Sequence, residues 1–432
     1  MRSRPACGRF AASANTRNRP GNDVKILILG LNYAPEPIGI GPYTAGLAEH
    51  LAGCGHEVTV VAGNPYYPDW TLAPGFTQAR SQAVEGGVTV VRVPHYIPAR
   101  PSGLKRIAHY LSFALSAWRP MQRIAREQKP DLVFTVAPSL LAAPVALIAA
   151  RRAGAASWLH IQDYEVEAAV ATGLLAKGPL ARLAGWVERK IIRGFDHVST
   201  ISAPMLAKAI EKGAAPCATH ELRNWAEAEG VGPQVDGQRL RAELQLPSGK
   251  IALYSGNLAL KQGVGLIAQA ARLLAERADL HFVVCGEGSG RELLEREAQG
   301  LTNLHLRPLQ PRTRLGELLA IADLHLLPQI ADAADLVLPS KLTNMLASGR
   351  PVVATAGVGT ALAAEVEGCG LVCPPGDARA FALAIAQLCD DEGARQALGA
   401  AAANRAGQRW SKNTLLEGFA SAFEQAAGAA GT

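Results

Sequence analysis

The sequence predicts an α/β protein with two doubly wound, Rossmann-like parallel sheets. From Asp23 onward, apolar runs bounded by Gly, Asn or Pro alternate with longer segments of helical periodicity, which is typical of strand–helix–strand units. The chain has 432 residues, 49% of them apolar, so it is too long for a single core and suits two domains. Its candidate strands form two groups on either side of a polar segment.

The first half supplies one set of candidate strands: Lys25–Leu31, His56–Gly63, Val88–Pro94, Asp131–Pro138, Ser157–Asp163 and His197–Ala203. The second half supplies Ile251–Asn257, Leu280–Gly288, Leu304–Leu309, Leu324–Gln329, Arg350–Ala356 and Gly370–Pro375. We expect an N-terminal domain over 24–226, a linker over 227–250, a C-terminal domain over 251–410 and a C-terminal helical segment over 411–432. Residues 1–23 are rich in arginine, lack a long apolar stretch and are expected to be a disordered basic extension.

Composition excludes several classes of site. No run of about 18 uncharged apolar residues is present, so no membrane-spanning helix is expected. The seven cysteines are scattered and odd in number, which favours free thiols in a reducing cytoplasm. Cys369 and Cys373 lie close together, but no second Cys/His pair completes a zinc site, so no metal is expected.

Two segments of the second half predict seats for phosphate. Asp335–Gly359 is predicted to be a loop, a short helix opening at Ser340 and a buried strand, and helix N-termini attract anions through unpaired N–H groups. Ile251–Gly263 repeats the arrangement with a strand, a Gly-Asn turn and Lys261 before the next helix. Two such seats on one sheet suggest a clamp for a nucleotide diphosphate.

At this point the chain resembles a known family over Val24 to about Gln425. The resemblance rests on the segments KILILGLNYAPEPIGIGPYTAGLAEHLAGCGHEVTVVAG, YSGNLALKQG, VVCGEGSGRELLE and LPSKLTNMLASGRPVVATAGVGTAL. It is similar to the retaining glycosyltransferases of GT-B architecture, family 4, and most to the branch of colanic-acid and exopolysaccharide fucosyltransferase-like enzymes. The resemblance implies two domains facing across a cleft, with a C-terminal helix that crosses back to the first domain.

The resemblance also implies a donor site on the second domain. Lys261 would stabilise the charge that builds on the leaving diphosphate. Many relatives pair this lysine with an arginine where this chain has Asn257, so Lys341 or Arg291 would compensate. For Lys261 and for Lys341, the alternative is an ordinary solvated lysine. The implied nucleotide platform further includes Gly286, Glu287 and Leu309, along with Ser340 on the phosphate loop.

Two expected glutamates are absent. Family members often carry them eight positions apart around the phosphate loop, where this chain has Leu336 and Asn344. Asn344 is expected to hydrogen-bond a ribose hydroxyl through its amide. Asp332 and Asp335 are nearby substitutes for a sugar contact, or only solvated loop residues.

In the first domain, Gly39 and Gly41 precede a helix that begins near Pro42, where glycine permits close approach of an anion. A plain tight turn is the alternative; the resemblance implies that Gly41 touches the donor diphosphate. Asp163 lies at the carboxyl end of a candidate strand and is expected to bind the acceptor or the transferred sugar. His160 is expected to be a buried, hydrogen-bonded strand residue, and Glu165 and Glu167 are acceptor-side candidates.

A basic, amphipathic segment precedes the fourth candidate strand. Apolar residues recur with helical spacing over 103–126. The segment from Arg92 to Lys129 has one acid, Glu127, and eight bases: Arg92, Arg100, Lys105, Arg106, Arg119, Arg123, Arg126 and Lys129. This pattern favours docking on anionic lipid, with an ordinary sheet-packing helix as the alternative. The net charge of +6 does not distinguish these two alternatives. A nucleic-acid partner is not expected, because the sequence has no recognisable nucleic-acid-binding motif.

The predicted function is transfer of a sugar, with fucose from GDP-fucose as the leading hypothesis, to a polyprenyl-diphosphate-linked saccharide in exopolysaccharide biosynthesis. The enzyme would act in the cytoplasm at the inner membrane face and need no cofactor besides the nucleotide-sugar co-substrate. Two alternatives remain open: a nucleotide-sugar epimerase of the same fold, and a noncatalytic scaffold subunit of a polysaccharide complex.

Overall fold

The computed structural model describes residues 23–37, 39–99, 102–167, 178–226, 230–258, 262–288, 290–330 and 340–430. Contacts divide the chain into two compact units. Unit 1 contains Met1–Arg223 and Leu416–Thr432, and unit 2 contains Asn224–Leu415. The chain therefore leaves unit 1 after Arg223 and returns to it within the last helix.

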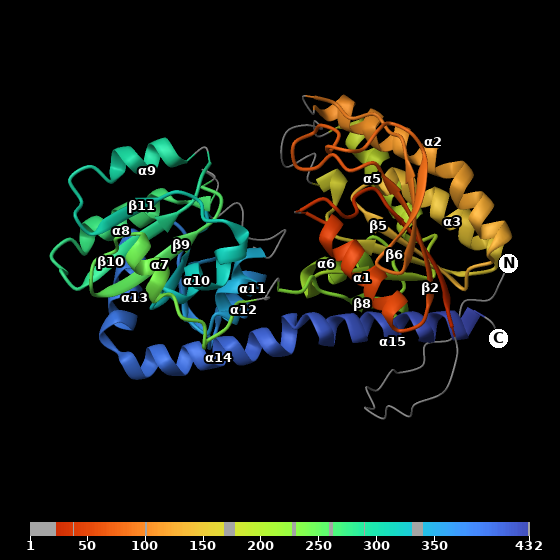
Figure 1. Cartoon of the computed structure of the whole chain (residues 1–432). Coiled ribbons are helices and arrows are strands. Elements are labelled where there is room, and N and C mark those ends of the chain that lie inside the picture. The colour runs from red at the N-terminus through yellow and green to blue at the C-terminus, as the bar shows by residue number, and fades with distance from the viewer. Residues whose placement is uncertain are drawn as a thin grey trace. The chain divides into compact units, whose positions relative to one another are not determined.

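Unit 1 is built on an eight-stranded sheet of order β3-β4-β2-β1-β5-β6-β7-β8 (Figure 1). Its strands are β1 Lys25–Gly30, β2 Glu57–Gly63, β3 Ser81–Glu85, β4 Val88–Val93, β5 Leu132–Ala137, β6 Ala156–Ile161, β7 His197–Thr200 and β8 Thr219–Glu221. Neighbours pair in parallel except β3, which runs antiparallel to β4. The sequence did not predict β3 or β8, because β3 is a polar, largely exposed edge strand and β8 has three residues.

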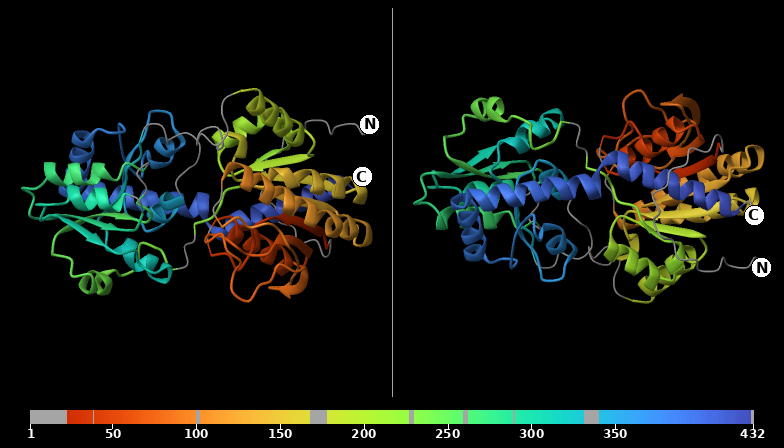
Figure 2. Two further views of the ribbon diagram at one scale, coloured as in Figure 1. Left: turned by 90° about the horizontal axis from the view of Figure 1, so that it is seen from above. Right: turned by 90° about the horizontal axis from the view of Figure 1, so that it is seen from below.

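Helices cover both faces of this sheet. They are α1 Gly41–Gly53, α2 Gly103–Glu127, α3 Ala143–Ala153, α5 Pro179–Ile192 and α6 Ala203–Glu211, with short 3-10 turns η1 Leu140–Ala142 and η2 Pro216–Ala218. Alternate strand residues serve the two faces. Val133 packs with Phe113 of α2 in one cluster, whereas the neighbouring Phe134 contacts Phe423 of α15. Figure 2 shows α2, α3 and α5 together in unit 1.

The last helix, α15 (Lys412–Ala430), belongs to unit 1 from Leu416 onward. Phe423 is fully buried, with its ring centroid 4.9 Å from that of Phe134 and 5.0 Å from that of Trp158. Glu424 lies 3.4 Å from the His56 ring. These aromatic contacts fasten the end of the chain to the first sheet.

Unit 2 is built on a six-stranded, all-parallel sheet of order β11-β10-β9-β12-β13-β14. Its strands are β9 Lys250–Ser255, β10 Leu280–Cys285, β11 Leu304–Arg307, β12 Leu324–Leu327, β13 Val352–Thr355 and β14 Gly370–Cys373. Its helices are α7 Gln238–Glu243, α8 Gly265–Leu273, α9 Arg291–Glu297, α10 Leu315–Ala320, α11 Ser340–Ala347, α12 Ala361–Val366, α13 Ala378–Asp390 and α14 Glu392–Trp410, with the 3-10 turn η4 Arg312–Arg314. The predicted fold class, two parallel Rossmann-like sheets, is confirmed.

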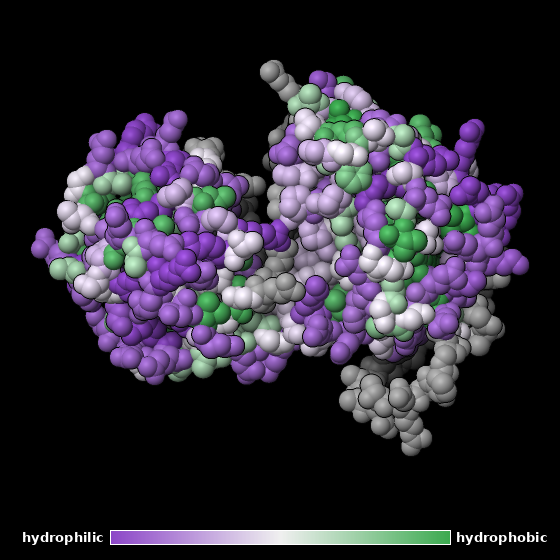
Figure 3. All heavy atoms as spheres, in the orientation of Figure 1, coloured by the Kyte–Doolittle hydropathy of each residue, from purple (hydrophilic) through white to green (hydrophobic). Residues whose placement is uncertain are grey.

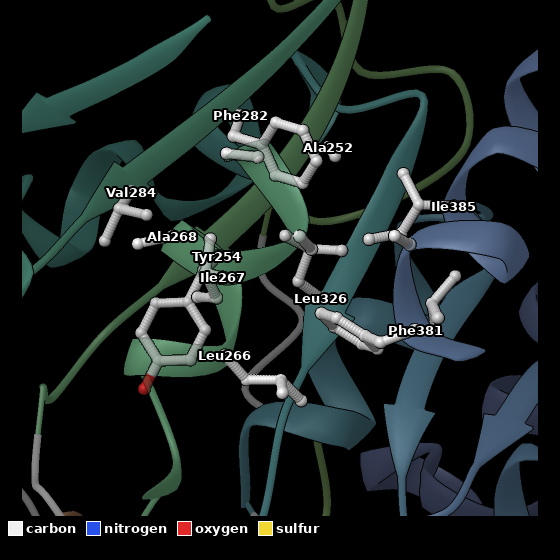
Figure 4. Close-up of a cluster of buried hydrophobic side chains, with 14 of the residues drawn as sticks. Ala252, Tyr254, Leu266, Ile267, Ala268, Phe282, Val284, Leu326, Phe381 and Ile385 are labelled. Carbon is white, nitrogen blue, oxygen red and sulfur yellow. The ribbon is translucent and has the colours of Figure 1, made fainter. Parts of the chain in front are cut away.

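The core of unit 2 places alternate residues of β9 on opposite faces of its sheet. Ala252 and Tyr254 join α8 and α13 in one cluster, and Ile251 and Leu253 join α7 and α10 in another. Figure 4 shows the first cluster, with the Tyr254 hydroxyl directed away from the apolar side chains. Leu240 of α7 is fully buried, so part of the segment expected to be a linker is a packed helix of unit 2.

Candidate active site

The carboxyl edge of the unit 2 sheet is held by hydrogen bonds between two backbone turns. The turn after β9 and the turn after β10 are joined by Leu258 N–H donating to Glu287 O at 2.8 Å and by Gly290 N–H donating to Leu258 O at 2.6 Å. Ligands of open α/β sheets bind at this edge. The predicted donor-site residues Asn257, Gly286 and Glu287 all lie in these two turns.

Gly286 sits where no other residue fits, because a Cβ there would lie 2.0 Å from Gly256 O. Arg291, at the start of α9, holds the same turn from the other side: its Nη1 donates to Gly286 O at 2.9 Å and to Arg307 O at 3.1 Å. Its Nε donates to Glu295 at 2.7 Å. Arg291 is therefore committed to fixing the turn. Leu309 is 54% exposed beyond β11.

Helix α11 brings Lys341 onto the turn after β9. Leu342, Met345 and Leu346 face the core at helical spacing, which leaves Lys341 on another face. Its Nζ donates to Tyr254 OH at 2.6 Å, Asn257 O at 3.1 Å and Gln262 Oε1 at 3.2 Å. Burial lowers the pKa of Lys341 to about 8. Of the two compensating cations that the sequence allowed, Lys341 is the one at this turn.

Asn344 lies one turn further along α11, and its Oδ1 is buried without a hydrogen-bond partner among the described residues. A buried acceptor of this kind suits an incoming donor, as the predicted ribose contact requires. Ser340 is the first residue of α11, but its side chain is not described. The predictions for Lys261, Asp332, Asp335 and Leu336 fall outside the described residues.

In unit 1, Gly39 lies in the loop between β1 and α1, and Gly41 is the first residue of that helix. The loop is fixed by Glu36, whose buried carboxylate accepts the N–H groups of Tyr66 at 3.0 Å and Tyr67 at 3.1 Å. Burial raises the pKa of Glu36. The two predicted glycines belong to unit 1 and the other donor-site candidates to unit 2.

The sequence analysis missed a cluster of aromatic and histidine rings at the carboxyl edge of the unit 1 sheet. Tyr66 lies at the centre, with ring centroids 4.8 Å from His109, 5.3 Å from His95 and 5.3 Å from Trp70. His109 Nε2 is 3.0 Å from Tyr66 OH, and burial lowers the pKa of His95 to about 4. The rings come from three separate segments; the run NPYYPDW after the second strand was the available signal.

Asp163 is the second residue after β6 and is exposed. Partial desolvation of its carboxylate raises the pKa of Asp163. The N–H of Tyr164 and the positive charge of Arg106 on α2 oppose this rise. Tyr110, also on α2, has a pKa raised to about 12 by burial and then by the charge of Glu165. These electrostatic influences link the end of β6 to the start of α2.

Glu165 and Glu167 have structural partners in unit 1. Glu165 accepts the N–H groups of Ser139 and of Leu140, the latter at 3.1 Å, and burial raises its pKa to about 7. Glu167 forms an ion pair with Lys212 at 2.5 Å. Neither carboxylate is free of partners, so Asp163 is the more available acid of the three.

His160 is buried on β6, as predicted. Its Nδ1 lies 2.8 Å from Ser199 Oγ, and burial lowers its pKa to about 3. Within the part of the chain that the structure describes, no group of three or more His, Cys, Asp or Glu side chains could hold a metal ion. The cysteines described there are all free.

Comparison with known proteins assigns both halves of the chain. Residues 39–225 match the model of a glycosyl transferase 4-like domain, and residues 236–405 match that of glycosyl transferases group 1. A putative colanic acid biosynthesis glycosyl transferase, WcaI, from Escherichia coli (strain K12) is 41% identical over 340 residues, which cover 77% of this chain and 83% of that protein.

Solved structures share the fold at low identity. A sucrose-phosphate synthase from Thermosynechococcus elongatus has a TM-score of 0.70 at 17% identity, covering 93% of this chain and 98% of that one. Anabaena HepE in complex with UDP has a TM-score of 0.65 at 17% identity, covering 93% of this chain and 100% of that one. At this identity the likeness concerns the fold.

Proposed function

Because the chain belongs to the glycosyltransferases that join a 4-like domain to a group 1 domain, we propose that it transfers a sugar from a nucleotide diphosphate to a lipid-linked saccharide. The printed name of its relative, a colanic acid biosynthesis enzyme, supports exopolysaccharide assembly as the setting. GDP-fucose is the proposed donor, and a polyprenyl-diphosphate-linked saccharide is the proposed acceptor.

The observation that carries the proposal is the edge of unit 2 built from glycines, beside the half-buried cation Lys341. In the transfer, the bond between the sugar carbon and the diphosphate oxygen breaks, and a bond from the acceptor hydroxyl oxygen to that carbon forms. The acceptor proton passes to the leaving diphosphate. Lys261 would stabilise the negative charge that develops there, and Asp163 would bind the acceptor or the sugar.

Nucleotide binding and turnover test this proposal directly. We expect GDP to bind more tightly than UDP or ADP in calorimetry, and GDP-fucose to be consumed only when a lipid-linked saccharide is present. Donor conversion without an acceptor would instead favour the epimerase, and the absence of nucleotide binding would favour the scaffold. If a nucleotide donor that carries another sugar is turned over instead, the proposed sugar is wrong and the proposed reaction, sugar transfer, still holds.

Lys261→Ala is expected to lower turnover by about 10²–10³, as for loss of one preorganised electrostatic group. Lys412→Ala is the matched control, because Lys412 is an exposed lysine of the same unit. Its Nζ lies over the Trp225 ring, 6.0 Å from the ring centroid. Circular dichroism should show both variants folded. Turnover of Lys261→Ala at the level of the control would remove Lys261 from the mechanism.

We also propose that unit 1 docks on anionic lipid through α2. Apolar side chains form an exposed stripe along this helix at steps of three and four residues: Leu104, Ile107, Leu111, Leu115 and Trp118. Leu104 is 83% and Leu115 76% exposed. Exposed bases accompany the stripe, and Figure 3 shows hydrophobic residues reaching the surface of unit 1. A basic, apolar helix surface suits a lipid headgroup layer.

Helix α5 carries a second stripe of this kind. Leu180, Leu183 and Trp186 are 65%, 56% and 53% exposed. The bases Arg182, Arg189, Lys190 and Arg193 are exposed as well. The one acid of α5, Glu188, is buried and paired with Lys212, so the outward charge of the helix is positive. Among the described residues no helix is long and apolar enough to cross a membrane.

Sedimentation with vesicles tests the docking. Charge reversal at Lys105, Arg119, Arg123 and Arg126 should abolish binding to anionic vesicles and spare turnover on a short, soluble acceptor. Each cation near such a surface contributes on the order of 1 kcal/mol. Arg106 is left intact because its guanidinium lies over the Trp70 ring at 5.6 Å.

The control reverses the same number of exposed bases on unit 2: Arg239, Arg296, Arg379 and Lys412. A third variant, with Leu180, Leu183 and Trp186 replaced by serine, should weaken vesicle binding while all α2 charges remain. Salt of about 1 M, where the Debye length is roughly 3 Å, should reproduce the α2 variant. Equal binding by the parent and the α2 variant would return α2 to a purely structural role.

A further inference from the structure

A buried pair of opposite charges joins two helices of unit 1. Lys212, which directly follows α6, is 8% exposed, and Glu188 of α5 is 2% exposed. The ammonium of Lys212 donates to the carboxylate of Glu188. Burying two charges costs free energy, and apolar side chains of similar volume often stabilise a protein as well or better. This buried pair is therefore better explained by the geometry that it imposes than by stability.

Lys212 also reaches a third element, the segment after β6. Its Nζ lies 2.5 Å from the Glu167 carboxylate and 5.2 Å from the centroid of the Tyr164 ring. Lys208, one turn earlier on α6, repeats both contacts, at 3.4 Å from Glu167 and 5.4 Å from the ring centroid. The two lysines balance the two glutamates, so the buried pair is part of a cluster without net charge.

The segment Asp163–Glu167 is held by contacts along its length. The Tyr164 ring is buried, and its hydroxyl donates to Met205 O of α6 at 2.7 Å. Glu165 accepts two backbone N–H groups just after β5. Asp163, at the start of the segment, is exposed. Lys212 thus contacts the part of the chain that carries Asp163 while it leaves the Asp163 carboxylate to solvent.

Helix α5 presents different residues on its two faces. Its outward face carries the exposed stripe of two leucines and a tryptophan that is proposed to lie on lipid, and Glu188 is buried on its inward face. Lys212 therefore ties the segment of Asp163 to a helix of the lipid-facing surface. An acceptor anchored in lipid holds its saccharide near that surface, so an acid fixed relative to the same helix suits such an acceptor.

We propose that Lys212 is a positioning residue for the sugar transfer: it holds the segment Asp163–Glu167 in place and thereby aims the carboxylate of Asp163. This assignment rests on the proposed function, in which Asp163 binds the acceptor or the sugar. Lys212 itself is buried among protein side chains and acts through Glu167 and Tyr164.

The first test removes the buried pair as a unit. In the variant Lys212→Met with Glu188→Met, unbranched apolar side chains replace both charges, so the fold should be kept. Turnover of the parent's donor, proposed to be GDP-fucose, on a short, soluble acceptor should fall by about 10- to 100-fold, as for a small misplacement of a binding group. Nucleotide affinity in calorimetry should match the parent, because the nucleotide-site candidates described above lie in unit 2.

The matched control makes the same substitutions in another ion pair of unit 1. Lys25 and Glu57 lie 3.5 Å apart, and both side chains are about half exposed. Lys25→Met with Glu57→Met should therefore keep the turnover of the parent.

A double-mutant cycle with Asp163→Asn separates positioning from general stability. If Lys212 acts through Asp163, removal of the buried pair should lower turnover far less once the carboxylate of Asp163 is gone. A network that only stabilises unit 1 would lower turnover by the same factor in both backgrounds.

Hydrogen exchange provides a readout that needs no turnover. The N–H groups of Ser139 and Leu140 donate to Glu165, so their exchange in the ligand-free protein reports whether the segment stays in place. Removal of the buried pair should speed their exchange by about tenfold or more, and the control should not change it. If the variant does not fold, Glu167→Leu replaces it, because this substitution releases the segment and leaves the buried pair intact.

The outcomes separate this assignment from the proposed function. If the parent transfers no sugar, both fail. If the parent transfers sugar and Asp163→Asn does so equally fast, the assignment fails and sugar transfer stands. Parent-like turnover without the buried pair, equal losses in the two backgrounds, or unchanged exchange at Ser139 and Leu140 would each overturn the assignment. Should Asp163→Asn leave no measurable turnover, the exchange rates decide alone.

Discussion

The carboxyl edge of the unit 2 sheet is built from backbone, whereas that of the unit 1 sheet is built from side chains. In unit 2 the turns after β9 and β10 touch through main-chain atoms, and Gly286 leaves no room for a Cβ. In unit 1 the corresponding edge is lined by rings such as Tyr66 and His109 and by the carboxylates of Glu36 and Glu165.

This difference fits the roles that we propose for the two units: unit 2 binds the donor diphosphate, and Asp163 of unit 1 binds the acceptor or the sugar. A diphosphate is the same in every nucleotide sugar, and main-chain N–H groups with one fixed cation suit it whatever the side chains nearby. An acceptor saccharide differs from enzyme to enzyme, and side chains are what a sequence can vary without disturbing strand ends. The unit 2 edge should therefore tolerate little change, and the unit 1 edge more.

The largest expected effect is that of Gly286→Ala. The added methyl group would lie 2.0 Å from Gly256 O, which forces the two turns of unit 2 apart. We expect a loss of about 4 kcal/mol or more in the free energy of unfolding, in the range kept for severe steric conflict. Urea denaturation followed by circular dichroism measures it, and nucleotide binding should be lost together with stability.

Gly39→Ala is the matched substitution in unit 1. Gly39 has φ +77, and its Cβ would lie 3.1 Å from Tyr67 Cε1, at the edge of a ring that can shift. The cost should be about 1–2 kcal/mol, that of a left-handed conformation in an ordinary residue. If the two alanine variants lose equal stability, the contrast between a backbone-built and a side-chain-built edge is wrong.

A smaller effect is expected from Glu165, whose pKa is raised to about 7 from its ordinary value of 4.5 by burial. The folded state then holds a proton that the unfolded state has released. The free energy of unfolding should fall as the pH rises from about 4.5 to 7, by about 1–3 kcal/mol. The cause is the burial of Glu165, and the N–H groups of Ser139 and Leu140, which it accepts, oppose the rise of its pKa.

Glu165→Gln should remove this dependence, because an amide does not titrate. The measurement is the difference in unfolding free energy between parent and variant at pH 4.5, 6 and 7.5, which cancels the contributions of other groups. The variant should be the less stable protein at pH 4.5 and approach or exceed the parent at pH 7.5. A constant difference across these pH values would mean that the pKa of Glu165 is not raised.

The fold could be predicted from the sequence because buried parallel strands are nearly continuous apolar runs, as in Lys25–Gly30 and Leu280–Cys285. Strands without that signal, β3 and β8, could not. Candidate site residues could be named most readily where they share one segment, as in the turn after β9. The Tyr66–His109 contact joins residues 43 positions apart, and nothing local in the sequence marks it.

The hydrogen-bond and ion-pair partners of charged side chains could not be predicted from the sequence either. Arg291 and Lys341 were equal candidates for a compensating cation, because composition shows charge and not partners. The structure separates them: Arg291 is paired with Glu295, and Lys341 bonds to neutral oxygens. Likewise, Glu165 and Glu167 were acceptor-side candidates with Asp163 until their partners in unit 1 were known.

The smallest expected effect on stability, and the most specific test of the unit 2 edge, is that of Asn344→Ala. Asn344 Oδ1 is buried without a partner among the described residues, so its removal should leave the ligand-free protein as stable as the parent, or up to about 1 kcal/mol more stable. If the amide serves the ribose, nucleotide binding should weaken by roughly 1–3 kcal/mol. Asn303→Ala is the control, because its Nδ2 donates to Ala271 O and Leu274 O: it should lose stability and keep nucleotide affinity. Opposite responses of two asparagines in one unit would separate a binding residue from a structural one, and unchanged nucleotide affinity in Asn344→Ala would assign Asn344 to helix packing.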